Sequence, residues 1–204
     1  MEKCERFAKP REIFRRIRSQ IEDADNKECV KEFEEAVEKL VSSYNTRNHE
    51  NRFVVGGALE ILFCALLRSL GFECEWLREL RYDLKIDGQR FSIKSNFTGR
   101  GTMRLINVLG KGTVEWAEPT LFFIGGHGIF YADPCMGLPT KRTGDALIID
   151  TREVLKIEEP WKIKINVPIK PKDPSHIRTA SYDVAKSVLE QIGSVFLKEY
   201  LPPA

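Results

Sequence analysis

The spacing of apolar residues predicts a chain in which helices alternate with short strands. Apolar positions three and four residues apart predict helices over 11–21, 27–44, 53–70 and about 182–199. The helix at 53–70 is apolar nearly all round, so we expect it to be buried. A further short helix is expected near 103–109. Alternating or continuous apolar stretches predict strands over 72–79, 81–87, 90–96, 120–124, 129–131, 146–149 and 161–167.

Residues 81–95, RYDLKIDGQRFSIKS, have the pattern of a β-hairpin. The Asp-Gly pair at 87–88 indicates a two-residue turn, because both turn positions need a positive φ angle that these residues tolerate. Such a turn places Asp83 opposite Ser92, on one polar face with Lys94. A turn one residue later pairs Asp83 with Lys94 instead, and the same three residues still share a face.

A carboxylate and a lysine side by side on rigid strands suit metal-assisted hydrolysis of a phosphodiester. The carboxylate of Asp83 can bind Mg²⁺, and Lys94 can orient the attacking water and neutralise phosphate charge. The alternative is an ordinary amphipathic hairpin with a solvated charged face, which is far commoner. The hairpin sequence alone therefore does not distinguish a catalytic site from an ordinary surface hairpin.

Glu60 is a single carboxylate in the middle of the apolar segment ALEILF at 58–63. A buried charge without a partner is costly, so Glu60 must face a partner, a cleft or a metal ion. The alternative to a functional role is a structural ion pair with an arginine such as Arg81. The sequence pattern leaves both explanations open.

Size and composition limit the remaining possibilities. The chain has 204 residues and a net charge of +2, which argues neither for nor against nucleic acid. No apolar run is long enough for a membrane span and no signal-peptide core is visible, so a cytoplasmic protein without a membrane partner is expected. The five cysteines are odd in number and lack metal-type spacing, which predicts reduced thiols and neither a disulfide framework nor a zinc site.

Two stretches are basic enough to contact phosphates. The predicted helix at 11–21 carries four arginines on one face, for which a solvated basic face is the favoured explanation over a phosphate-contacting one. Residues 96–112 are rich in glycine and carry Arg100, Arg104 and Lys111 directly after the strand that bears Lys94.

The order of these features resembles the PD-(D/E)XK nuclease superfamily, and within it the type II restriction endonucleases. The resemblance covers about 53–131 and rests on Glu60, Asp83 and the Ser92-Ile93-Lys94 triplet. It implies an αβββαβ core, restriction-endonuclease-like, with a mixed central sheet flanked by helices. Two positions depart from the family pattern, since Tyr82 replaces the proline and Ser92 replaces the acidic residue.

The resemblance also implies roles for individual side chains. Asp83 and Glu60 would bind Mg²⁺, with Mn²⁺ as a possible substitute, and Lys94 would position the nucleophile. Ser92 would hold a metal-bound water through its hydroxyl group. The DNA contacts would come from the segment after the catalytic strand, namely Asn96, Arg100, Arg104 and Lys111.

In these terms the chain would be a sequence-specific endonuclease of double-stranded DNA that leaves 5′-phosphates. It would act as a homodimer, with a cognate DNA methyltransferase in the same system. An N-terminal helical segment, 1–50, would pack on a nuclease domain, 51–204, with its core at 53–131 and C-terminal strands and helix at 146–200. The alternatives are a structure-specific repair or recombination nuclease and a catalytically dead, DNA-binding nuclease fold.

Overall fold

The computed structural model describes residues 2–44, 49–79, 81–107, 115–169 and 180–203. Its helices are α1 (Glu2–Glu5), α2 (Ala8–Glu22), α3 (Lys27–Ser43), α4 (His49–Ser69), α5 (Thr151–Leu155) and α6 (Ser181–Gln191). The short 3-10 helices are η1 (Ala24–Asn26), η2 (Pro134–Met136) and η3 (Leu197–Tyr200). The strands are β1 (Cys74–Trp76), β2 (Leu84–Ile86), β3 (Gln89–Asn96), β4 (Thr102–Asn107), β5 (Thr120–Ile124), β6 (Gly128–Ala132), β7 (Thr140–Thr143), β8 (Ala146–Asp150) and β9 (Lys162–Ile163).

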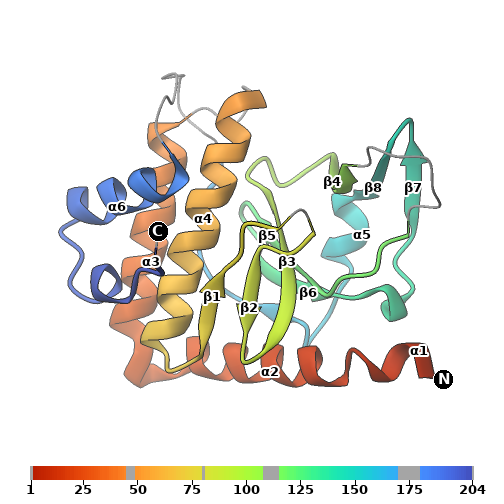
Figure 1. Ribbon diagram of the computed structural model, residues 1–204, viewed down its shortest axis with the longest axis horizontal. Helices are drawn as coiled ribbons and strands as arrows, with labels where there is room; N and C mark the ends of the chain where they lie inside the picture. The colour runs from red at the N-terminus through yellow and green to blue at the C-terminus, as the bar shows by residue number, and fades with distance from the viewer. Residues whose placement is uncertain (1, 45–48, 80, 108–114, 170–179, 204) are drawn as a thin grey trace.

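Two sheets organise the molecule. The larger one has the strand order β1-β2-β3-β5-β6-β9, and the smaller one has the order β4-β8-β7. Strands β1, β2 and β3 form an antiparallel meander, and β5 then pairs with β3 in parallel. In Figure 1, α3, α4 and α6 lie on one side of the large sheet, α2 runs below it, and the small sheet stands on the other side. The predicted mixed α/β class with a mixed central sheet between helices is confirmed.

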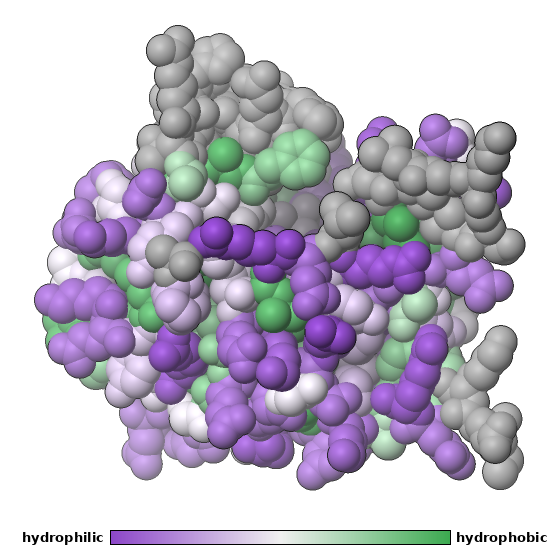
Figure 2. Space-filling view, in the orientation of Figure 1, coloured by the Kyte–Doolittle hydropathy of each residue, from purple (hydrophilic) through white to green (hydrophobic). Residues whose placement is uncertain are grey.

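The large sheet separates two hydrophobic cores. Along β5, Leu121 and Phe123 belong to the core that includes α2, α3, α4 and α6. Phe122 and Ile124 belong to the second core, which includes the inner face of the small sheet and Val154 of α5. This alternation is the period-two pattern of a strand buried on both faces. Hydrophilic side chains cover most of the surface in Figure 2.

The turn between β2 and β3 lies at 87–88, as the sequence predicts. Asp87 and Gly88 have φ angles of 45° and 78°, and Leu84 pairs with Phe91. This register rules out the turn one residue later. It also places Leu84 and Phe91 fully inside the first core, which leaves the opposite face of the hairpin for polar residues.

The prediction of a short helix near 103–109 is wrong, because residues 102–107 form strand β4. Met103 and Leu105 are buried and Arg104 between them is exposed, so the pattern has the period of a strand. In so short a segment the two periods are hard to distinguish. Residues 108–109 lie outside the described part of the chain.

The C-terminal helix predicted over 182–199 is also wrong in its extent. Helix α6 ends at Gln191, and Gly193 follows with a φ angle of 67°. The N–H groups of Gly193 and Ser194 bond back to carbonyls of α6, which is a glycine-based helix stop. Val195, which lies beyond this stop, is 68% exposed.

The cysteine prediction is wrong for one pair, because Cys4 and Cys135 form a disulfide. The two residues are 131 positions apart, so their spacing in sequence carries no sign of the pairing. The fold brings the N-terminal helix α1 against η2. Cys29, Cys64 and Cys74 are free and buried, as expected for core residues. Among the described helices, none combines the length and apolar character that crossing a bilayer requires.

Candidate active site

Asp83 lies where the two strands of the hairpin begin to separate. Its backbone N–H still donates to the carbonyl of Phe91 at 2.9 Å, but the paired residues of β2 start only at Leu84. The Asp83 carboxylate accepts the backbone N–H of Ile93, and the Ser92 hydroxyl donates to the same oxygen at 3.0 Å. The carboxylate is thus held between the ends of the two strands by two hydrogen bonds from β3.

Lys94 lies beside this carboxylate, as the predicted shared face requires. The distance from Lys94 Nζ to Asp83 Oδ2 is 3.7 Å, and both side chains are partly exposed. Strand β3 is clamped between β2 and β5, because Lys94 pairs with Phe122 on the parallel neighbour. The ammonium group therefore projects from an inner strand of the large sheet.

Glu60 reaches the same region from helix α4. The indole N–H of Trp76 on β1 donates to Glu60 Oε2 at 3.0 Å. Glu60 and Arg81 are both within the described residues, and no ion pair joins them. The Arg81 side chain is exposed. The structural ion pair with Arg81 is therefore not observed. The sequence did not identify Trp76, although a partly buried tryptophan on the first strand signals a need for an indole acceptor.

The pKa of the Glu60 carboxyl is raised to about 7. Burial is the main cause and the negative charge of Asp83 is the second, while the Trp76 hydrogen bond and the Lys94 charge act in the opposite direction. Glu60, Asp83 and Lys94 therefore form one electrostatic unit. At neutral pH two carboxylates compete for one lysine, so an additional cation would be favourable here.

The donor set fits a hard cation that keeps most of its water. Within the described residues no group of three or more His, Cys, Asp or Glu side chains could hold a metal ion. Mg²⁺, however, is usually bound through one or two carboxylates together with waters and substrate phosphates. Asp83 and Glu60 supply two such carboxylates, and the charge of the ion would offset the unfavourable ionisation of Glu60.

The Ser92 hydroxyl contacts Asp83, whereas the resemblance implies that it holds a metal-bound water. Its side chain is only 5% exposed, and its hydroxyl hydrogen is directed to Asp83. This hydroxyl orients the neighbouring carboxylate, while its lone pairs stay available. The predicted contact with a metal-bound water stays a prediction.

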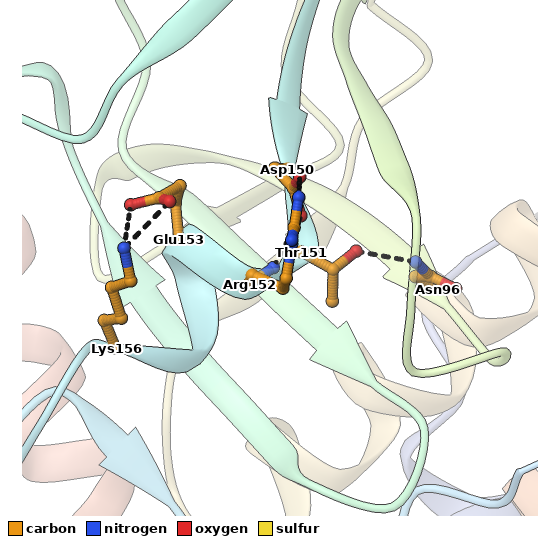
Figure 3. A network of polar contacts seen from close by, with 6 residues as sticks. All are labelled: Asn96, Asp150, Thr151, Arg152, Glu153 and Lys156. Atoms are coloured by element: carbon orange, nitrogen blue, oxygen red, sulfur yellow. Dashed lines mark hydrogen bonds and ion pairs between the residues drawn. The ribbon is translucent and has the colours of Figure 1, made fainter.

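The amide of Asn96, a predicted DNA contact, is engaged within the protein (Figure 3). It donates to the Arg100 carbonyl and to the Thr151 hydroxyl, each at 2.9 Å. Its oxygen accepts the backbone N–H and the hydroxyl of Thr98. Asn96 therefore fixes the loop after β3 and ties it to α5.

The other predicted DNA contacts have different outcomes. Arg100 and Arg104 are exposed, so both can reach a ligand in solvent. Lys111 lies outside the described residues. These three remain predictions.

The arginines of α2 hold this helix to the rest of the molecule. Arg11 binds Asp133, Arg16 binds Asp87, and Arg18 binds both Glu22 and Glu159. Arg15 lies over the ring of Trp161 at 4.6 Å. The arginines of this helix therefore serve packing, while Arg15 and Arg16 are also exposed, as the explanation of a solvated face predicts.

The site thus combines two carboxylates, a lysine and a hydroxyl at one end of a mixed sheet. These groups come from three separate elements, α4, the start of β2 and β3. Comparison of the chain with known protein families, with curated proteins and with solved structures finds no match.

Proposed function

We propose that this protein is a Mg²⁺-dependent endonuclease that hydrolyses phosphodiester bonds in double-stranded DNA. The observation that carries the proposal is the electrostatic unit of Glu60, Asp83 and Lys94, in which a carboxylate with a pKa of about 7 lies near a second one. Structural carboxylates are normally compensated by the protein itself, whereas within the described residues Lys94 is the single cation that acts on this pair. The resemblance to PD-(D/E)XK nucleases supports the same chemistry.

In this proposal Asp83 and Glu60 hold Mg²⁺, which when bound acts as a Lewis acid on the phosphate and favours ionisation of a water. Lys94 orients the attacking water and offsets charge on the phosphate. Ser92 and the N–H of Ile93 keep the Asp83 carboxylate in place, and Trp76 does the same for Glu60. The products would carry 5′-phosphates.

The finer proposal is a type II restriction enzyme. Such an enzyme would recognise a short DNA sequence, act as a homodimer and be accompanied by a cognate DNA methyltransferase. The resemblance supports these statements, together with the exposed basic side chains after β3. A structure-specific repair nuclease would use the same site on branched DNA.

Incubation of the purified protein with supercoiled plasmid and Mg²⁺ tests the proposal. We expect cleavage that EDTA abolishes and that Asp83→Asn eliminates, while Ca²⁺ supports DNA binding with little cutting. Discrete fragments would indicate a restriction enzyme, and selective cutting of a four-way junction would indicate a structure-specific nuclease. Undiminished cleavage in EDTA, or binding without cleavage in Mg²⁺ and Mn²⁺, would overturn the proposed function.

A further inference from the structure

Exposed cations on the small sheet lack the partners that other cations in this protein have. Lys141 and Arg142 on β7 and Arg104 on β4 are exposed. In the described part of the chain none of these three makes an ion pair with a carboxylate, whereas Arg11, Arg16 and Arg18 of α2 each do. Arg142 has only a long bond, at 3.4 Å, to the carbonyl of Gly144.

The strand register places two of these cations in one row. Arg104 pairs with Ile148 on β8, and Ile148 pairs with Lys141 on β7. Residues paired across neighbouring strands share a face of the sheet. Met103 and Ile149, next to this row, belong to the second hydrophobic core. Arg104 and Lys141 therefore occupy the outer face.

Arg142 lies on the same edge strand as Lys141 but projects to the other face, because it pairs with Leu147 of the second core. Strand β7 is the last strand in the order β4-β8-β7, and all four of its residues are exposed. It joins β8 through a two-residue turn in which Gly144 has a φ angle of 57°. The free edge strand of this three-stranded sheet therefore carries both Lys141 and Arg142.

The small sheet is fixed next to the candidate active site. Strand β4 begins six residues after the last residue of β3, the strand that carries Lys94. The N–H of Thr151 donates to the Gly101 carbonyl at 2.8 Å, and Asn96 donates to the Thr151 hydroxyl (Figure 3). In Figure 1 the small sheet stands beside the large one, on the side away from α4.

From this placement we infer that the outer face and free edge of the β4-β8-β7 sheet bind the phosphate backbone of duplex DNA. Arg104, Lys141 and Arg142 are the contacting residues. Duplex DNA is the occupant that matches the charge, because its closely spaced phosphates attract neighbouring cations. Within the described residues these three cations make no ion pair, and Lys141 interacts with Asp150 only at longer range. The inference rests on the proposed function, because it assigns the surface that positions the substrate.

Binding of a short labelled duplex, measured by fluorescence anisotropy in Ca²⁺ over a range of salt concentrations, tests the inference. The variant Lys141→Gln/Arg142→Gln should lower the slope of log affinity against log salt by about 2, since each lost phosphate contact contributes about 0.9. Affinity at low salt should fall at least about tenfold. Arg104→Gln should lower the slope by about 1.

The control is Lys186→Gln/Lys198→Gln, which removes two exposed cations from α6 and η3 on the opposite side of the molecule. It should leave affinity and slope unchanged. Equal losses in both double variants would mean non-specific charge attraction and would overturn the assignment. So would unchanged binding by the β7 variant, or a wild-type protein that binds no duplex. Circular dichroism melting of each variant verifies the fold, and Lys141→Ala/Arg142→Ala repeats the test if the first variant melts early.

The two proposals fail in different ways. If the wild-type protein cleaves DNA and the β7 variant binds normally, the surface assignment is wrong and the nuclease function stands. If the wild-type protein binds duplex DNA through β7 but never cleaves it with Mg²⁺ or Mn²⁺, the surface assignment stands and the nuclease function is wrong.

Discussion

Two carboxylate clusters of this protein differ in how completely the protein compensates their negative charge. Asp133 is fully buried and receives two bonds from the Arg11 guanidinium, at 2.7 and 2.9 Å, one from the Tyr131 hydroxyl and one from the N–H of Cys135. In the other cluster Glu60 and Asp83 share Lys94, whose ammonium group stands 3.7 Å from the Asp83 carboxylate.

The electrostatic consequences differ accordingly. Burial and the Asp133 charge raise the pKa of the Tyr131 hydroxyl. This phenol therefore stays neutral and donates its hydrogen bond to the Asp133 carboxylate. In the second cluster burial and the charge of Asp83 raise the pKa of Glu60 to about 7. A compensated carboxylate joins helix α2 to the sheet, whereas an uncompensated one is suited to recruit a cation. The completeness of pairing thus separates the structural site from the candidate functional one.

The largest expected effect is on stability, from breaking the compensated cluster. Arg11→Ala should lower the free energy of unfolding by about 3–5 kcal/mol, because it leaves the Asp133 charge buried with only two neutral donors. Chemical denaturation of the oxidised protein measures it. Arg15→Ala, which removes only a contact with the Trp161 ring, should cost about 1 kcal/mol.

Cleavage by Arg11→Ala should be normal at temperatures where the variant is folded. A large loss of activity in fully folded Arg11→Ala would place Asp133 in the functional site and remove the contrast. A loss of stability no greater than that of Arg15→Ala would show that the Asp133 cluster is not the anchor of α2.

The second effect is on catalysis, from removing the lysine of the uncompensated cluster. Lys94→Ala should reduce the cleavage rate at least about a hundredfold, because a group that acts mainly in the transition state is lost. Its DNA affinity in Ca²⁺ should be retained. Lys85→Ala is the matched control on the same hairpin, since Lys85 pairs with exposed Glu75 at 3.0 Å. Near-normal cleavage by Lys94→Ala would remove Lys94 from the site.

Much of the fold around this cluster could be predicted from the sequence. The strand at 120–124 has the predicted limits, and the turn at 87–88 follows from the steric needs of its two residues. Strands β1 and β2 are shorter than predicted, at three residues each. Pairing stops near Asp83, where the two strands of the hairpin separate. Strand pairing is a tertiary property, so apolar alternation alone overestimates it.

The site could be predicted only in part. The common polar face of Asp83 and Lys94 follows from the two-residue period of a hairpin, and the structure confirms their proximity. The charge of Glu60 within an apolar helix signalled a special environment, but not its contact with Trp76. The pairing of Arg11 with Asp133 spans 122 residues and leaves no local pattern in the sequence.

The third effect is a pH-dependent change in stability from neutralising Glu60. Because the folded pKa is raised from 4.5 to about 7, the wild-type protein loses stability as the pH rises through this interval. Glu60→Gln should therefore match the wild type near pH 5 and exceed it near pH 8, by at most about 3 kcal/mol. Thermal melting in EDTA at both pH values measures the difference.

Two further measurements accompany Glu60→Gln. Glu75→Gln is the control for the loss of one carboxylate, because the Glu75 side chain is mostly in solvent. In Mg²⁺ the Glu60→Gln protein should cleave DNA far more slowly than the wild type, since one of two carboxylates for the cation is gone. A destabilised Glu60→Gln with nearly intact cleavage would assign Glu60 to structure and reverse the comparison.

The smallest effect concerns Ser92, whose hydroxyl is the neutral hydrogen-bond donor of the uncompensated cluster. Ser92→Ala removes one hydrogen bond to Asp83 and leaves the N–H of Ile93 and the charge of Lys94 in place. One such bond contributes about 1 kcal/mol, so cleavage should fall about fivefold. Ser95→Ala, on the other face of β3, should leave cleavage unchanged.

A matched change in the compensated cluster completes the comparison. Tyr131→Phe likewise removes one hydroxyl donor from a carboxylate, and it should lower stability by about 1 kcal/mol without changing cleavage. A hundredfold loss of cleavage in Ser92→Ala would exceed what one orienting hydrogen bond can supply. Ser92 would then act directly in the reaction, as a holder of the attacking water, and the serine would replace the family's acidic residue in function as well as in position.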